Sequence, residues 1–344
     1  MTTHERELTE PVDLCSPDGL LLNPAARGWS RRPLHRANLQ GRFGFNKRWD
    51  YWAILAGDLI VSTTYADVDH LGLADVYWAD LATSETGGQS IVVGAGEGIA
   101  LPEEPGTTPL EIDRDSLNLR ISDGVEGTHL LASWVELDGN PGRLDVVVAM
   151  PDRYESLNVV IPWSDELFNF TSKHQARPAA GELIVGDRRW HIGGPGASES
   201  WGVLDVGRGR WPAQINWNWG GGAGRCDGHV IGLQIGAKWT EGTGFTENGL
   251  IVDGRLSKLG SELDWNYDWE SPMGPWRVTD PNGQLDATLT PRFDKHSRMD
   301  VSTELGSETH QVFGTWAGHL VSDEGLALEF SGLQGFAEEA RQRW

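Results

Sequence analysis

An alternation of side chains with a period of two residues recurs along the chain and fixes the class of fold it can adopt. In HVIGLQIGAKW, which begins at His229, the odd positions from Ile231 to Ala237 are apolar and the even positions are Gly, Gln and Gly. Successive side chains of a strand point to opposite faces, whereas a helix repeats about every 3.6 residues. Similar runs rich in β-branched and aromatic residues cover 50–69, 128–137, 143–151 and 156–163. We therefore expect an all-β protein built from antiparallel strands.

Glycine and tryptophan dominate the composition in a way that favours a curved sheet. The chain has 44 Gly and 17 Trp, against only 9 Phe and 5 Tyr. Dense glycine marks tight turns, bulges and close backbone approaches, and indoles need large apolar surroundings. Only GFAEEARQRW, residues 335–344, has a helical pattern. We expect a short helix there, at the C-terminus.

The length and two internal matches indicate two related units. A chain of 344 residues suits two domains of ordinary size. RWDYWAILAGD is matched later by NWNWGGGAGRCDG, and GRLDVVVAMPDR by GQLDATLTPRFD, in the same order. The glycine-rich loop 193–200 separates the two halves. We expect residues 1–195 to form an extended, proline-containing N-terminal arm and a first β-barrel, and residues 196–344 to form a second.

The net charge and the number of cysteines limit the binding partners and the cellular compartment that we expect for the chain. The net charge of −22 disfavours nucleic acid and acidic membrane surfaces as partners. Cys15 and Cys226 form no disulfide framework, which fits a reducing compartment. No window reaches the roughly 18 apolar residues of a membrane span, and the N-terminus has no apolar signal segment. We expect a cytoplasmic protein without stable membrane insertion; the sequence leaves its oligomeric state open.

Four blocks of sequence carry a family resemblance. These are LCSPDGLLLNPAARGWSRRPLHRANLQG, NKRWDYWAIL, NFTSKHQARPAAGELIVGDRRW and LDVGRGRWPAQINWNWGGGAG. They resemble domain-of-unknown-function family 2804 over nearly the whole chain. More remotely, a Trp-x-Trp strand ahead of an Asp-Gly turn is similar to the AttH-like proteins, a group that includes carotenoid 1,2-hydratase, with tocopherol cyclase a looser relative.

The resemblance implies tandem lipocalin-like barrels and a large apolar ligand, often an isoprenoid. In the hydratases and cyclases an acid protonates an alkene. The Asp-Arg-Glu-Trp-Gly string of those hydratases is replaced here by LDVGRG, residues 204–209.

Standard catalytic and cofactor motifs are missing from the sequence. There is no His-Glu-x-x-His, Cys-x-x-Cys, Gly-x-Ser-x-Gly or Walker loop, and no dinucleotide-binding glycine spacing. No two of the ten histidines are two or four residues apart. We therefore expect neither a metal site nor a cofactor.

Candidate ligand-binding residues lie in GVLDVGRGRWPAQINWNWGGGAG, residues 202–224. On a strand, Trp217 and Trp219 share one face and Asn218 lies on the other. The indoles either form an aromatic wall in the second barrel, which can stabilise a carbocation by up to about 2 kcal/mol per desolvated contact, or simply fill that barrel. The candidate ligand-binding residues are Trp211, Trp217, Asn218, Trp219, Arg208 and Arg210.

Asp205 and Glu247 are the candidate catalytic acids. Asp205 either forms an ion pair with Arg208 or Arg210 at the barrel mouth, or acts as a general acid, which needs a raised pKa that nearby cations oppose. Glu247 lies among uncharged neighbours in FTENGLIVDG. It is either an exposed turn residue or a carboxyl that stays protonated near neutral pH.

Three classes of function follow from these patterns together with the resemblance, which alone implies the alkene chemistry. The first is a cofactor-free enzyme that protonates an alkene, a hydro-lyase or cyclase acting on an isoprenoid-like or lipid-like molecule. The second is a non-catalytic carrier of such a molecule. The third is a structural or interaction protein whose barrels are filled by side chains. A cavity, and an acid inside it, would distinguish them.

Overall fold

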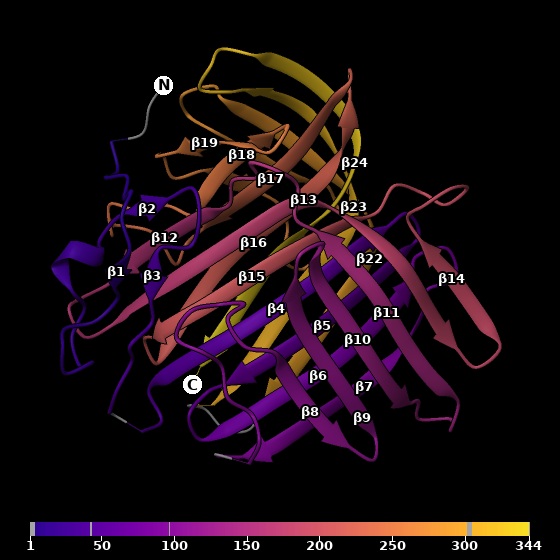
Figure 1. The fold of residues 1–344 in the computed structure, drawn as a ribbon. Helices are drawn as coiled ribbons and strands as arrows, with labels where there is room; N and C mark the ends of the chain where they lie inside the picture. Colours follow the sequence, from indigo (N-terminus) through magenta and orange to yellow (C-terminus); the bar gives the residue numbers. More distant parts are fainter. Residues whose placement is uncertain (1–3, 42, 96, 301–304, 344) are drawn as a thin grey trace.

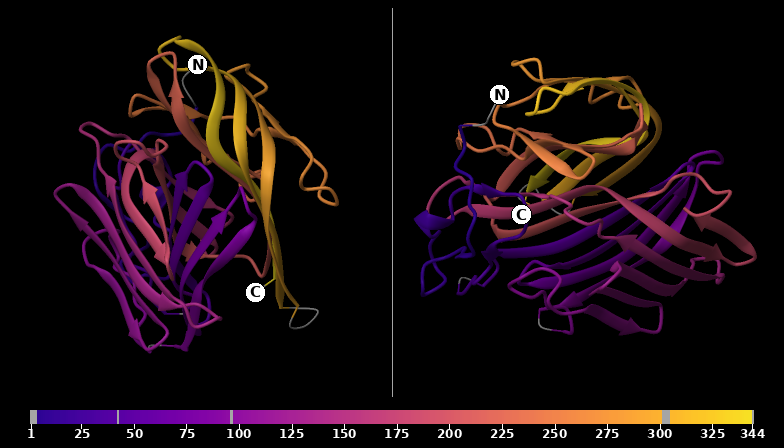
Figure 2. Two further views of the ribbon diagram at one scale, coloured as in Figure 1. Left: turned by 90° about the vertical axis from the view of Figure 1, so that its right-hand side faces the viewer. Right: turned by 45° about the horizontal axis from the view of Figure 1, so that its top comes forward.

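The computed structural model describes residues 4–41, 43–95, 97–300 and 305–343. The fold is almost entirely β, and two curled antiparallel sheets lie against each other (Figures 1 and 2). One short 3₁₀ turn, η1 (Pro24–Ala26), interrupts the arm. None of the helices in the described part is long and apolar enough to cross a membrane. The all-β, lipocalin-like fold expected from the sequence is confirmed.

The first sheet is built on a path of consecutively paired strands in the order β7-β6-β5-β4-β15-β13-β11-β10-β9-β8. Its members are β4 (Asn46–Ala56), β5 (Leu59–Asp67), β6 (Leu71–Asp80), β7 (Glu85–Gly94), β8 (Leu110–Arg114), β9 (Leu117–Gly124), β10 (Gly127–Val135), β11 (Pro141–Ala149), β13 (Phe168–Val185) and β15 (Trp201–Arg210). Off this path, β12 (Leu157–Pro162) pairs with β13 and with β2 (Trp29–Ser30), and β14 (Arg188–Ile192) pairs with β13.

The second sheet has the order β19-β18-β17-β16-β24-β23-β22-β21-β20. Its members are β16 (Gln214–Cys226), β17 (His229–Ala237), β18 (Asn248–Val252), β19 (Arg255–Leu259), β20 (Asp264–Asn266), β21 (Trp276–Thr279), β22 (Leu285–Asp300), β23 (Gly306–Val321) and β24 (Ala327–Arg343). In neither sheet do the two end strands pair with each other, so both sheets curl as open half-barrels.

The two sheets share one strand plan. In each, the first long strand pairs with the last one, β4 with β15 and β16 with β24. The matched Trp-containing segments therefore occupy corresponding strands, β4 and β16. The second pair of matched segments, GRLDVVVAMPDR and GQLDATLTPRFD, lies on β11 and β22. These strands also have corresponding positions in the strand orders of the two sheets. The internal repeat read from the sequence is thus a repeat of strand order.

The passage between the sheets lies later than the loop 193–200. β15 pairs with β4 and β13 and so belongs to the first sheet, and the next strand, β16, begins the second. The chain changes sheet at residues 211–213. The division into domains at residues 195 and 196 remains a prediction.

The expected C-terminal helix is wrong, because residues 327–343 form the strand β24. This strand lies between β16 and β23 and pairs with both along most of its length. Helix propensity is a weak preference that tertiary pairing overrides. The buried carboxyl groups of Glu338 and Glu339 accept hydrogen bonds from Trp217 of β16 and from Tyr267, which follows β20, and these partners offset the cost of burying charged residues in the strand.

Each half-barrel is filled by its own apolar side chains. One buried cluster draws only on the first sheet and its loops, around Leu144, Val146 and Leu183. A second draws only on the second unit, around Ile231, Leu233 and Trp316. A third cluster contains residues of both sheets, among them Leu55 of β4 and Phe336 of β24. The sheets are therefore joined by an apolar seam.

The N-terminal arm is extended and bonded to both units. It contains β1 (Val12–Asp13) and β3 (His35–Arg36), which pair in parallel. The Arg210 guanidinium donates to the backbone carbonyls of Gly19, Leu20 and Gln40. At the other end of the arm, Glu5 forms a buried ion pair with Lys258 of β19, 2.8 Å apart.

Candidate functional site

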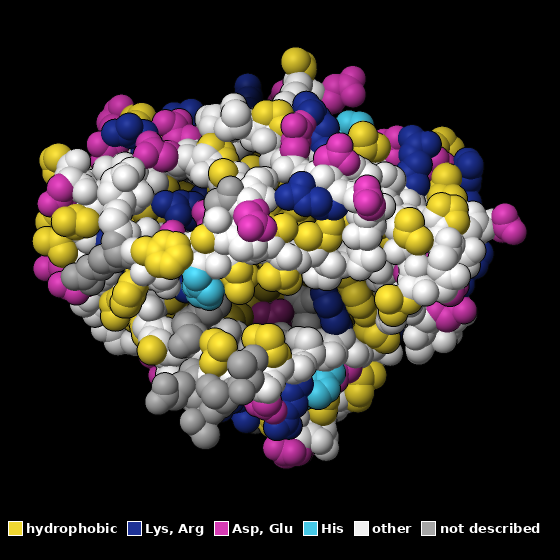
Figure 3. Space-filling view, turned by 90° about the horizontal axis from the view of Figure 1, so that it is seen from below, with side chains coloured by type: hydrophobic (Ala, Val, Ile, Leu, Met, Phe, Trp, Pro, Cys, Tyr) yellow, Lys and Arg dark blue, Asp and Glu magenta, His cyan; other side chains and the backbone are white. Residues whose placement is uncertain are grey.

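A cavity of about 300 Å³ lies between the two sheets. β4, β5, β13 and β15 line it from the first sheet, β16, β22, β23 and β24 from the second, and Trp211, Trp239 and Glu247 from the connections. The expectation of a cavity inside the second barrel is therefore wrong, since that interior is packed by its own side chains. Seen from below, the molecule is hollowed between the sheets, with apolar, acidic and basic side chains in the hollow (Figure 3).

Five indoles form one wall of the cavity. Trp211 lies in the short connection between β15 and β16, where the sheets meet. It stacks on Trp239 with ring centroids 5.3 Å apart, and meets Trp217 and Trp49 at 5.7 and 5.5 Å. Trp219 lines the cavity beside them. Trp217 and Trp219 share a face, as their spacing predicts, but that face is turned to the first sheet.

A buried lysine joins the two candidate acids. Lys173 Nζ of β13 lies 2.8 Å from Asp205 Oδ1 and 3.1 Å from Glu247 Oε2. It also lies 4.6 Å from the ring centroid of Trp219. Burial works to lower the pKa of Lys173, but the two carboxylates together hold it above its ordinary value. Lys173 is therefore a fixed positive charge at one side of the cavity.

Asp205 is held by three donors on the cavity side of β15. Besides the lysine, the Trp49 indole N–H donates to Oδ2 at 3.1 Å and the Thr171 hydroxyl to Oδ1 at 3.2 Å. These contacts satisfy both oxygens. Asp205 is thus a well-bound carboxylate rather than an isolated acid.

Glu247 precedes β18 and is almost completely buried, with 1% of its surface exposed. Its Oε1 accepts a hydrogen bond from the Trp239 indole N–H at 2.5 Å. Burial raises the pKa of Glu247 to about 7, the charge of Asp205 adds to the rise, and Lys173 opposes it. The expectation of an exposed turn residue is therefore wrong, and the carboxyl titrates near neutral pH.

Glu338 of β24 is a third acid in the cavity, and it is not among the site residues predicted from the sequence. It lies directly opposite Trp219 in the ladder between β16 and β24, and its Oε1 accepts from the Trp217 indole N–H at 2.7 Å. Burial raises the pKa of Glu338 to about 7. Among the described residues, no lysine or arginine forms an ion pair with it. Alternation along β24 would have shown Glu338 on one face with Phe336, but this segment was read as a helix.

Arg208 and Arg210 lie on the face of β15 opposite Asp205 and do not line the cavity. Arg208 pairs with Asp50 at 2.7 Å, and Arg210 bonds Asn46 and the N-terminal arm. The expected ion pair of Asp205 with either arginine is therefore wrong. The reason is the period of two: residue 205 is an odd number of positions from 208 and from 210.

Asn218 likewise faces away from the cavity. Its amide donates to the Tyr267 hydroxyl at 2.9 Å and to the backbone carbonyl of Glu338 at 3.1 Å. It supports β16 and β24 from the far side. The candidate ligand-binding residues that the cavity brings together are therefore Trp211, Trp217 and Trp219.

Two buried polar groups that line the cavity have neither a hydrogen-bond partner nor an ion-pair partner among the described residues. They are both amide atoms of Asn169 and the indole N–H of Trp211. Buried polar groups normally find a partner. Asn169, Thr171 and Lys173 lie two residues apart along β13 and share the cavity face. Ser172 and His174 on the other face are polar too, so the sequence alone does not distinguish the cavity face.

Comparisons with known proteins agree with this fold. A family model described as "Domain of unknown function (DUF2804)" matches residues 5–344. The solved structure of an AttH-like protein from Nitrosomonas europaea superposes with a TM-score of 0.52 at 14% identity, covering 87% of this chain and 93% of that one. None of the curated proteins matches the sequence.

Two further solved structures are similar at lower scores. Kievitone hydratase from Nectria haematococca has a TM-score of 0.47 at 11% identity, covering 99% of this chain and 98% of that one. CghA in complex with Sch210972 has a TM-score of 0.45 at 11% identity, covering 96% and 97%. The remote similarity to AttH-like proteins is thus confirmed for the fold, and the chain belongs to the DUF2804 family.

Proposed function

We propose that this member of the DUF2804 family binds an apolar, isoprenoid-like or lipid-like molecule between its two sheets and protonates an alkene carbon of that molecule. The observation that carries the proposal is Glu338, a buried carboxyl with a pKa raised to about 7 that faces a cavity walled by indoles. The chemistry is that of a hydro-lyase or a cyclase and needs only the side chains of this chain.

The shape and lining of the cavity support binding of a largely apolar molecule. Its volume of about 300 Å³ is at the lower end of ordinary ligand sites. Apolar ligand surface that is buried against these aromatic faces stabilises the complex by about 25 cal/mol per Å². The unpartnered Asn169 amide and Trp211 N–H can bond an oxygen atom of the ligand. A molecule with a hydrocarbon body and one polar group therefore fits the lining.

The acid chemistry is divided between Glu338 and Glu247. A carboxyl with a pKa near the working pH is suited to proton transfer in either direction. Lys295 and Lys173 both lower the pKa of Glu338, but neither forms an ion pair with it among the described residues. Lys173 Nζ lies 3.1 Å from Glu247 Oε2 and directly stabilises the ionised form of Glu247, so we assign Glu338 as the donor. Proton transfer from Glu338 to an alkene carbon leaves a carbocation and a carboxylate. The indole faces stabilise that carbocation.

The second step depends on the nucleophile. In hydration, a water oxygen bonds to the cation and gives its proton to the carboxylate of Glu247. In cyclisation, a second double bond of the same molecule attacks instead, and the proton lost from the product returns to a carboxylate. Both routes place a solvent proton on carbon in the first step.

Deuterium incorporation tests this step. The apolar molecule that co-purifies with the protein is identified by native mass spectrometry and incubated with the protein in deuterium oxide. We expect carbon-bound deuterium in the product of the wild type. Glu338→Gln should keep binding but lose incorporation by at least about a hundredfold, because the amide is nearly isosteric and cannot supply the proton.

The matched control is Glu329→Gln, an exposed position on the same strand, which should incorporate deuterium at the wild-type rate. Equal incorporation in Glu338→Gln would remove Glu338 as the acid. Binding without incorporation in the wild type would leave the carrier function.

A further inference from the structure

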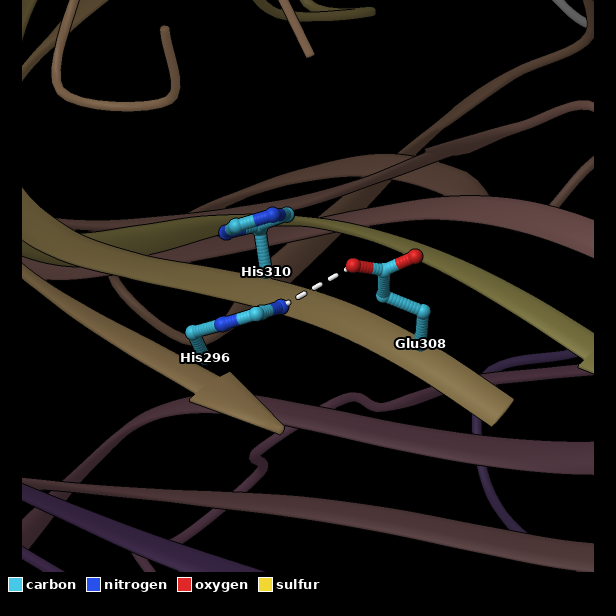
Figure 4. Close-up of side chains that lie close together, drawn as sticks. All are labelled: His296, Glu308 and His310. Carbon is cyan, nitrogen blue, oxygen red and sulfur yellow. Dashed lines mark hydrogen bonds and ion pairs between the residues drawn. The ribbon is translucent and has the colours of Figure 1, made fainter. Parts of the chain in front are cut away.

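Two histidines and a glutamate meet on the hairpin of β22 and β23, outside the cavity (Figure 4). His296 and His310 are direct partners in the ladder, and their rings stack with centroids 4.2 Å apart. Glu308 lies two residues before His310 and therefore on the same face. One ligand atom from each residue lies within 4.8 Å of the others.

The cluster lies on the opposite face of the hairpin from the cavity. Thr309 and Gln311, which alternate with these residues on β23, line the cavity. Val312, on the same face as His310, belongs to the packed interior of the second sheet. The cluster thus lies at the open end of that interior, where His310 is mostly buried and 43% of the His296 side chain is exposed.

One carboxylate orients His310. Asp294 Oδ2 lies 2.7 Å from His310 Nδ1, and a carboxylate at this position favours the tautomer with the proton on Nδ1 and the lone pair on Nε2. The edge of Trp269 packs against the ring, with centroids 4.6 Å apart. A carboxylate on the far nitrogen is the arrangement that fixes the tautomer and raises the basicity of metal-binding histidines.

We propose that His296, Glu308 and His310 bind one divalent transition-metal ion, of which Zn²⁺ is the best fit. His296 Nε2 and Glu308 Oε1 are 3.1 Å apart. Two ligands at about 2.0–2.1 Å from a tetrahedral ion lie roughly 3.3 Å from each other, so this pair is close to the required spacing. The rings of His296 and His310 are stacked and nearly parallel, so the exposed His296 ring must turn out of the stack for both imidazoles to bind one ion. Two imidazoles and one carboxylate favour Zn²⁺ over Ca²⁺ or Mg²⁺, which take oxygen ligands.

The surroundings allow an ion to enter. Arg298 Nη1 is 3.8 Å from Glu308 Oε1, but its side chain is 59% exposed and can turn into solvent when the ion binds. The exposed edge of His296 leaves the remaining coordination position to water. The spacing rule that predicted no metal site considered neighbours within one strand or helix, whereas these histidines meet across a hairpin.

Titration with Co²⁺ tests the site directly, because tetrahedral Co²⁺ absorbs visible light. The full chain is prepared without a histidine tag and stripped with a chelator. We expect one Co²⁺ per chain, displaced by Zn²⁺ and not by Mg²⁺. His296→Ala should weaken binding at least about tenfold, and this exposed position leaves the fold intact. Asp294→Asn should keep the stoichiometry and weaken binding by about 10- to 100-fold.

His191→Gln, an exposed histidine on β14, is the matched control and should bind like the wild type. His310→Gln provides a second ligand variant, with circular dichroism to check its fold. Absence of tetrahedral Co²⁺ absorption in the wild type, or wild-type affinity for Co²⁺ in both His296→Ala and His310→Gln, would overturn the proposal.

Discussion

Glu338 illustrates how a single side chain acquires its chemistry from its surroundings. Burial between the sheets raises its pKa, and the Trp217 indole donates to one oxygen. Glu247, a second buried carboxyl, is bonded to Trp239 and to Lys173. Two acids with similar pKa values therefore differ in their partners, and the proposed function assigns them different roles for this reason.

The raised pKa of Glu338 predicts a pH-dependent stability. Its pKa rises from 4.5 to about 7, so between these values the folded chain holds a proton that the unfolded chain has released. The contribution of Glu338 to stability therefore falls as pH rises through this window. At about 1.4 kcal/mol per pH unit, the total is about 3 kcal/mol.

Glu338→Gln removes this dependence. Relative to the wild type, its free energy of unfolding should rise by up to about 3 kcal/mol between pH 4.5 and pH 8, measured by urea denaturation. Glu329→Gln, an exposed change on the same strand, should differ from the wild type by a constant amount. A constant difference for Glu338→Gln as well would mean that the pKa of the carboxyl is not raised in the folded chain.

At the scale of strands, the two-residue alternation of side chains explains which features the sequence predicts correctly and which it does not. The alternation in β16 and β17 identified strands and the shared face of Trp217 and Trp219. The same rule separates Asp205 from Arg208, and applying it there would have avoided the wrong ion pair. β24 was misread because FAEEARQ has helical propensity, and strand pairing on both sides was invisible in the sequence.

The site partners could not be read from local patterns either. Lys173 meets Glu247 across two sheets, and His296 meets His310 across a hairpin. Such contacts depend on which strands become neighbours, and a single sequence does not fix that order. The indoles of the site were found because three of them lie in one segment.

Gly236 of β17 gives a prediction at this scale. A Cβ atom there would lie 2.1 Å from Glu247 Oε1, and the other nearest atoms also belong to Glu247. Gly236→Ala should displace the carboxylate from Trp239 and leave Lys173 short of a partner. We expect a loss of up to about 3–5 kcal/mol in the free energy of unfolding.

Gly124→Ala on β9 is the control, because its Cβ would meet only one atom, at 3.8 Å. It should change the free energy of unfolding by less than about 1 kcal/mol. If Gly236→Ala proves equally mild, Glu247 is not held against β17.

At the scale of the molecule, the site exists because two units with packed interiors meet along one face. The glycines of β16 and β17 allow this contact: a Cβ at Gly221 would meet the Gln175 side chain at 2.6 Å, and one at Gly232 would meet Ala176 at 3.1 Å. Ala176 sits at the bulge of β13, in a left-handed conformation. The cavity beside this contact takes its acids and its indoles from both units.

Native mass spectrometry of the protein purified from its own cells tests the central claim most directly. We predict one apolar molecule bound per chain in the wild type and in Trp190→Ala, an indole outside the cavity. Trp217→Ala should lose most of the bound molecule. The substitution removes about 60 Å² of apolar contact, and at about 25 cal/mol per Å² this loss raises the Kd roughly tenfold. No bound molecule in the wild type, or equal occupancy in all three proteins, would contradict a ligand site between the sheets.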